Sequence, residues 1–93
     1  MRRAARTDNN QNAIREAMEK CGASVLSLAQ IGKGCPDLLV AFRGKNYLVE
    51  VKNGDRYWSM TQDQREFHTA WMAPIAVLDS VEAAIDWLKK LAN

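Results

Sequence analysis

The chain has 93 residues, 47% hydrophobic and 26% charged, which is the balance of an ordinary globular protein and not of a disordered tail. Its length allows one domain, residues 1–93, with one hydrophobic core, and excludes two independently folding units. The formal net charge of +2 is too small to identify a nucleic-acid partner by itself.

Targeting signals and cysteine frameworks are not indicated. No apolar run approaches the roughly 18 residues needed to cross a membrane, and no apolar segment follows the N-terminal arginines as in a secretory signal. We therefore expect a cytoplasmic protein without a membrane partner. Cys21 and Cys35 are the only cysteines, and with the single His68 they support neither a zinc cage nor a disulfide framework.

The first predicted element is a helix from about Asp8 to Cys21. Ile14, Ala17 and Met18 recur at helical spacing, and Gly22 follows as a helix stop. A short strand is expected over Ser24–Leu28. The segment after it contains two glycines and predicts a loop before Pro36.

Two apolar runs, Asp37–Phe42 and Tyr47–Lys52, predict a β-hairpin. The four residues between them, 43–46, predict its turn. A turn of this length would set Asp37 opposite Lys52 and Leu39 opposite Glu50. Since side chains alternate along a strand, one face should be continuous apolar core. The other face should carry Asp37, Leu39, Leu48, Glu50 and Lys52.

The second half predicts a helix, a strand and a final helix. Thr61 and Gln64 stand at capping-box spacing before a helix that should turn Phe67, Ala70 and Trp71 inward and end by Pro74. The apolar segment 75–78 predicts a strand. A second capping pattern, Asp79 with Glu82, should open the last helix. Its inward stripe is Val81, Ala84, Ile85, Leu88 and Leu91.

The expected order is therefore α-β-β-β-α-β-α, an α/β domain with a mixed central sheet of about four strands flanked by helices. Two carboxylates and an ammonium group gather at one end of this sheet. Asp37 and Glu50 can converge on one cation, and oxygen ligands favour Mg²⁺ or Mn²⁺. The backbone carbonyl of Val51 is a further candidate ligand.

This group has the parts needed for phosphodiester hydrolysis. A bound metal acidifies water and draws a phosphate oxygen, while Lys52 can orient or deprotonate the water and offset the developing charge. Asp37, Glu50 and Lys52 are therefore the candidate catalytic residues. In an arbitrary hairpin, Glu50 and Lys52 would be solvent-facing residues of an edge strand. The Pro-Asp dipeptide after a glycine loop and the shared face favour a site.

Three ordered motifs strengthen this interpretation: Gly34-Cys35-Pro36-Asp37-Leu38-Leu39-Val40, Leu48-Val49-Glu50-Val51-Lys52 and Thr61-Gln62-Asp63-Gln64. Together they resemble the VRR-NUC branch of the PD-(D/E)xK nucleases, in particular its short stand-alone members from phages and bacteria. The similarity runs from about Asp8 through the last helix. It implies a restriction-endonuclease-like fold, divalent-metal dependence and structure-selective cutting of branched DNA, with Holliday-junction resolution as one known family activity.

The resemblance also suggests two further site residues. Gln64 matches the family's glutamine after the hairpin, where it could position a water or contact the phosphate. Completing the capping box is an equally good role, and one residue cannot easily do both. The family often carries an acidic residue on its first helix at the metal. Asp8 is the best match here, with a purely N-capping role as the alternative.

Several residues remain open between binding and ordinary structural roles. Gln30 and Lys33 could hold a phosphate, although loop residues of this kind are more often simply solvated. Arg2 and Arg3 could form a DNA-contacting arm or belong to a frayed terminus. A structural or surface role is expected for His68, because no partner for a catalytic base is apparent.

We expect a homodimer that acts on DNA. Tyr57, Trp58, Met60 and Met72 supply more large apolar groups than a four-stranded core needs, and the stand-alone relatives that the chain resembles are dimeric. Tyr57 and Trp58 could instead stack on an unpaired base or be buried, which would leave a monomer. The alternative function is a catalytically inactive DNA-binding or assembly module on the same fold.

Overall fold

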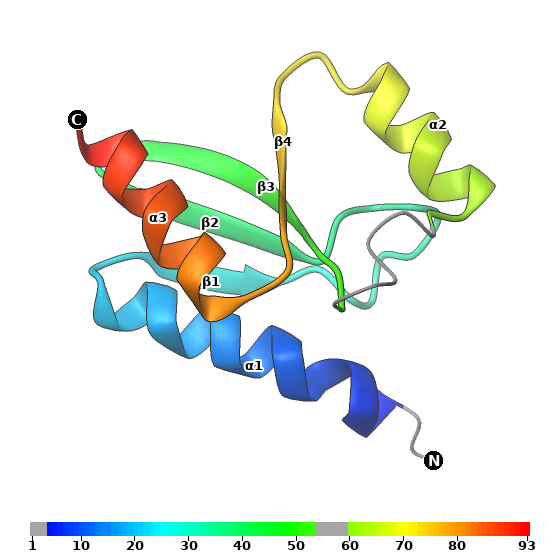
Figure 1. Cartoon of the computed structure of the whole chain (residues 1–93). Helices are drawn as coiled ribbons and strands as arrows, with labels where there is room; N and C mark the ends of the chain where they lie inside the picture. Colours follow the sequence, from blue (N-terminus) through cyan, green and yellow to red (C-terminus); the bar gives the residue numbers. More distant parts are fainter. Residues whose placement is uncertain (1–3, 54–59) are drawn as a thin grey trace.

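The computed structural model describes residues 4–53 and 60–93, with side chains from residue 10 onward in those ranges. Within them the order of elements is the predicted one (Figure 1). The elements are α1 (Ala4–Lys20), β1 (Ser24–Ser27), β2 (Leu38–Phe42), β3 (Lys45–Val51), α2 (Gln62–Ala70), β4 (Ile75–Leu78) and α3 (Val81–Ala92). None of the described helices is long and apolar enough to cross a membrane.

The four strands form one sheet in the spatial order β1-β2-β3-β4. The first three are joined as antiparallel neighbours, whereas β4 returns through α2 and pairs parallel to β3. A small α/β domain with a mixed sheet is thus confirmed.

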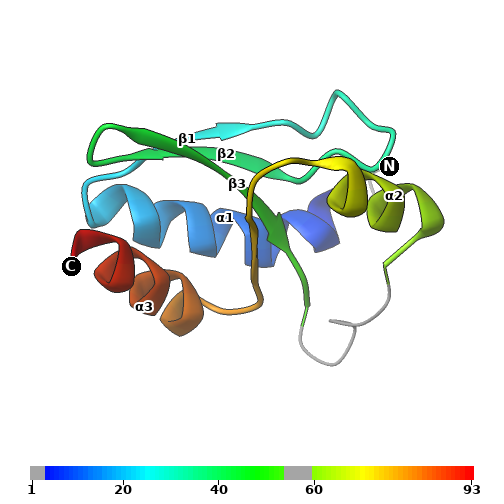
Figure 2. The same ribbon diagram turned by 90° about the horizontal axis from the view of Figure 1, so that it is seen from above.

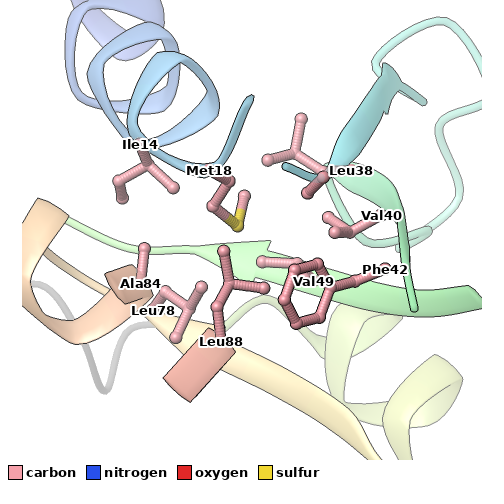
Figure 3. Packing of buried hydrophobic residues seen from close by; sticks show 10 residues of the cluster. Ile14, Met18, Leu38, Val40, Phe42, Val49, Leu78, Ala84 and Leu88 are labelled. Atoms are coloured by element: carbon pink, nitrogen blue, oxygen red, sulfur yellow. The ribbon is translucent and has the colours of Figure 1, made fainter. Parts of the chain in front are cut away.

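The hydrophobic core lies between one face of this sheet and two helices. α1 and α3 lie side by side beneath that face, while α2 lies apart from them, toward the C-terminal end of β3 (Figures 1 and 2). Alternate residues of β2 and β3 point into the core, as the hairpin pattern predicted (Figure 3). The buried cluster comprises Ile14, Met18, Ala23, Leu38, Val40, Phe42, Val49, Leu78, Ala84 and Leu88.

The end of α1 is determined by Gly22, which has φ +99°. The Gly22 amide donates to the Glu19 carbonyl and the Ala23 amide to the Met18 carbonyl, each at 3.0 Å. This pair of bonds is a Schellman motif, as the predicted glycine stop implied. The start was predicted too late. α1 begins at Ala4, so Asp8 lies inside the helix and the N-cap interpretation of Asp8 is wrong.

The predicted hairpin turn was two residues too long. Only Arg43 and Gly44 connect the strands, with φ +53° and +86°, and Lys45 already pairs with Phe42. Two positive φ values are those of a type I′ turn. Arginine is not a usual residue for this conformation, so no strong sequence signal marked it. The pairing therefore moves by two residues, which leaves every side chain on its predicted face.

α2 begins as predicted and packs differently. Thr61 and Gln64 form the expected capping box. However, no residue of α2 is fully buried: Phe67 is half-buried, Ala70 is exposed and Trp71 is 47% exposed. Only Gln64, Phe67 and His68 of this helix are half-buried. The Phe67 and Trp71 rings stack on each other, with 5.2 Å between the ring centroids.

α3 is capped by Ser80, not by the predicted pair Asp79 and Glu82. The Ser80 hydroxyl accepts a hydrogen bond from the Ala83 amide at 3.0 Å. Aspartate and serine are comparable N-caps, and their adjacency made the choice ambiguous. The inward stripe is confirmed, since Ala84 and Leu88 are buried and its other members are half-buried.

Candidate functional site

The two candidate carboxylates lie where β2 begins and β3 ends. The paired ladder closes with Leu38 opposite Val49, so Asp37 and Glu50 each lie one residue beyond the last pair. The predicted pairing of Asp37 with Lys52 is therefore wrong, because the turn is two residues shorter than expected. Burial is the largest cause that raises the pKa of Glu50, and the Asp37 carboxylate lies close enough for its charge to raise this pKa further. Asp37 Oδ2 also accepts a hydrogen bond from the Val51 amide at 2.7 Å, which ties Asp37 to the strand that carries Glu50.

Glu50 and Lys52 form an unusually buried charged pair. Glu50 is 1% exposed and Lys52 is 8% exposed. The Lys52 ammonium nitrogen lies 3.6 Å from Glu50 Oε2. Neither residue is a solvent-facing position of an edge strand, because β3 is an interior strand of the sheet.

Gln64 joins this pair from the first turn of α2. Its Nε2 donates to Glu50 Oε2 at 3.0 Å, and its Oε1 accepts from Lys52 Nζ at 3.2 Å. The same Oε1 accepts from the Thr61 amide at 2.9 Å and closes the capping box. Gln64 thus completes the capping box and contacts the Glu50–Lys52 pair at once, because its amide oxygen has two lone pairs and uses both. Its role in positioning a water or contacting the phosphate stays a prediction.

His68 lies one helical turn after Gln64 and faces the other oxygen of Glu50. His68 Nε2 is 3.8 Å from Glu50 Oε1. Both atoms are buried, and neither has a hydrogen-bond partner among the described residues. No partner for His68 was apparent from the sequence. The four-residue spacing from Gln64, which places both on one helix face, was the signal that could have found it.

The pKa of Glu50 is raised from 4.5 to about 7. Burial is the largest cause and the neighbouring Asp37 carboxylate the next, while Lys52 opposes both. The pKa of His68 is lowered, first by burial and then by the Lys52 charge. Near neutral pH, Glu50 therefore titrates while His68 is mainly uncharged. A perturbed carboxyl group of this kind is typical of functional sites.

The residues present fit a hard divalent cation. A buried carboxylate oxygen without a donor, Glu50 Oε1, beside a second carboxylate is a suitable place for positive charge. No three Cys, His, Asp or Glu side chains of the described residues form a ready cation cage. Mg²⁺ does not need one, because it binds through one or two carboxylates and keeps several waters. The Val51 carbonyl remains a candidate further ligand.

An apolar cavity of about 520 Å³ opens on the same face of the sheet as the site. Leu39 and Leu48, two residues from Asp37 and Glu50 along their strands, line it. Phe67 of α2 and Trp71, the C-cap of this helix, also line it. Cys35 also lines this cavity, and the charges of Glu50 and Asp37 act on its thiol. The cavity therefore adjoins the charged site.

Asn10 is a structural contributor that sequence reasoning missed. Its Nδ2 donates to the Lys52 carbonyl at 2.9 Å and to the Asp79 carbonyl at 3.4 Å. It thereby joins α1 to the ends of β3 and β4. An asparagine inside a helix carries no sequence signal for such a distant contact.

Among the remaining predicted site residues, only Gln30 and Lys33 have described side chains. Gln30 and Lys33 are exposed in the loop before β2. The backbone of Asp8 is helical, but its side chain lies outside the described part of the chain, so its metal role stays a prediction. Four more predicted residues lie outside the described residues: Arg2, Arg3, Tyr57 and Trp58.

Comparisons with protein-family models, with curated proteins and with solved structures found no match in any of the three.

Proposed function

We propose that the chain is a divalent-metal-dependent endonuclease that hydrolyses phosphodiester bonds of DNA. The observation that carries this proposal is the convergence of Asp37, Glu50, Lys52 and Gln64 at one end of the sheet. Burying two ionisable groups costs several kcal/mol each in typical proteins, about the same order as the pairing gain. Such a group is therefore better explained by chemistry than by stability.

Each residue has a role that its contacts support. Asp37 and Glu50 would hold Mg²⁺ or Mn²⁺, which would supply an acidified water and draw charge from the phosphate. Lys52 lies beside Glu50 and can orient the attacking water and offset the charge on the phosphate. Gln64 fixes the relative position of Glu50 and Lys52 through its two hydrogen bonds. A restriction-endonuclease-like fold is part of this proposal.

Branched DNA is the proposed substrate, with the four-way Holliday junction as the leading candidate. The support is the motif resemblance, together with the lack of a base-reading module in so short a chain. Selectivity would then depend on DNA shape and on phosphate contacts, to which the exposed loop residues Gln30 and Lys33 would contribute. Binding should weaken steeply as salt rises.

Cleavage of labelled four-way junctions, flaps, splayed arms and linear duplex tests the proposal directly. We expect cutting in Mg²⁺ or Mn²⁺, none in chelator, and preference for a branched substrate. Glu50→Gln and Lys52→Ala should each lower the cleavage rate by about 100- to 1,000-fold, the usual effect of deleting an electrostatic catalytic group. Binding of the junction should persist in both variants.

The matched controls are Glu82→Gln and Lys90→Ala, which change the same residue types at exposed positions of α3. Both should cut like the unaltered protein. Junction binding without cleavage in any metal would instead support the inactive DNA-binding module. Full activity of folded Glu50→Gln would remove the site from the mechanism, and equal cutting of linear and branched DNA would refute the substrate assignment.

A further inference from the structure

Gly34 lies in the loop before β2, where this loop passes against the first turn of α2. Its φ is +79°, and a Cβ built on it would lie 2.2 Å from the Asp63 carbonyl oxygen and 2.8 Å from the Gln64 nitrogen. Real Cβ contacts essentially never fall below 3.0 Å. The opposing atoms are backbone and cannot rotate away, so only glycine permits this approach.

The approach is important because the described side chains of α2 meet the sheet from one half-buried face only. None of its residues is fully buried, and the helix touches the sheet through half-buried side chains. Gln64 is anchored in the helix by its own amide, which donates to Thr61 Oγ1 at 3.1 Å. A backbone shift of the first turn would therefore carry the Gln64 side chain away from Glu50 and Lys52.

We propose that Gly34 is a positioning residue: it lets the glycine loop and the start of α2 pack backbone to backbone, and this contact sets Gln64 on the Glu50–Lys52 pair. The catalytic consequence rests on the proposed nuclease function. The structural half does not, because the placement of Gln64 can be measured without DNA or metal.

Gly34→Ala and Gly32→Ala form a matched pair for the test. Gly32 has a similar φ of +70°, yet a Cβ there would meet nothing within 4 Å. Both substitutions therefore carry a similar backbone penalty, and only Gly34→Ala adds the collision. We expect the side-chain amide resonances of Gln64 to shift or broaden in NMR spectra of Gly34→Ala, and to stay in place in Gly32→Ala.

In cleavage assays, Gly34→Ala should lower kcat by about 100-fold, as small misplacements of catalytic groups do, with little change in KM. Gly32→Ala should retain nearly full kcat. The effect should also be non-additive. In a Gln64→Ala background, Gly34→Ala should have almost no further effect on kcat, whereas a merely structural defect would lower it again.

Unchanged Gln64 resonances in folded Gly34→Ala, or equal effects of the two alanines, would overturn the proposal. Should Gly34→Ala fail to fold, the unaltered protein still decides the matter. A nuclear Overhauser effect between a Gly34 α-hydrogen and the Gln64 amide is expected at this separation, and its absence would refute the contact. These NMR results remain valid even if the protein cuts no DNA, which separates this proposal from the proposed function.

Discussion

Glu50 is a residue whose ionisation in the folded protein departs far from its behaviour in water. Its folded-state pKa of about 7 exceeds its ordinary value of 4.5, so between these pH values the folded protein holds a proton that the unfolded chain releases. Stability from this group is therefore fully present below pH 4.5 and lost as pH rises through about 7. The loss is on the order of 3 kcal/mol at most, from 1.36 kcal/mol per pKa unit.

Glu50→Gln should abolish this dependence. We expect the variant without metal to unfold at a higher urea concentration than the unaltered protein at pH 8, and at a similar one at pH 4.5. Mg²⁺ should stabilise the unaltered protein at pH 8 and have little effect on Glu50→Gln. Urea unfolding in chelator and in Mg²⁺ across this range measures both effects. If the stabilities of the two proteins changed with pH in parallel, the pKa of Glu50 would not be raised by folding.

The residue types of the site were predictable, but their contacts were not. Side-chain alternation sorted Asp37, Glu50 and Lys52 to one face even though the predicted turn was too long, because an error of two residues preserves the face. The dual bonding of Gln64 depends on how α2 meets β3. The distance between α2 and β3 is fixed by tertiary packing, for which a local sequence pattern contains no information.

At the scale of elements, the sequence predicted periodic and capped segments well and long-range geometry poorly. The strands and the Thr61 capping box follow from local rules, and both are confirmed. The inward packing of Ala70 and Trp71 was wrong, because amphipathic spacing does not show how much of a helix face the sheet will cover. The crossover through α2 instead leaves this helix at the side of the sheet, where its first turn meets the site.

Thr61 and Ser80 are the N-caps of α2 and α3, so removing each capping hydroxyl tests whether the start of α2 has a role in cleavage. Thr61→Ala and Ser80→Ala each delete an N-cap and should each reduce stability by about 1 kcal/mol. Only Thr61→Ala should also slow cleavage, because Thr61 anchors the turn that carries Gln64. Thermal unfolding and single-turnover cleavage measure the two effects. Similar cleavage by both variants would mean that the α2 cap does not influence the site.

At the scale of the whole molecule, one apolar region is available for a second copy. Met72 is 96% exposed, beside Trp71 at 47%, and Ile31, which lines the apolar cavity with Trp71, is 60% exposed. A homodimer through this region is the proposed working unit, since a two-fold pair of sites suits paired cuts across a symmetric junction. Met60, just before α2, is half-buried and so exposes a smaller fraction of its surface than Met72.

Met72→Lys should convert the dimer into a monomer, because it places a charge in the apolar contact. Leu26→Lys is the control, since Leu26 is 59% exposed on the edge strand β1. Light scattering coupled to size exclusion should give about twice 10.5 kDa for the unaltered protein and for Leu26→Lys, and about 10.5 kDa for Met72→Lys. If Leu26→Lys dissociated the dimer and Met72→Lys did not, the interface would lie at the sheet edge and not at Met72.

The half-buried Cys35 gives the molecule a chemical reporter for its ion. Burial, then Glu50, then Asp37 raise the pKa of its thiol, so the thiolate that reacts with alkylating reagents is scarce. A divalent cation held by the two carboxylates would cancel their contribution and increase the thiolate. Iodoacetamide should then label Cys35 faster in Mg²⁺ than in chelator, with exposed Cys21 as the internal reference. If the ratio of Cys35 to Cys21 labelling does not change with Mg²⁺, the ion does not bind at the two carboxylates. If the ratio rises with Mg²⁺ concentration, this dependence gives the affinity for the ion without any DNA.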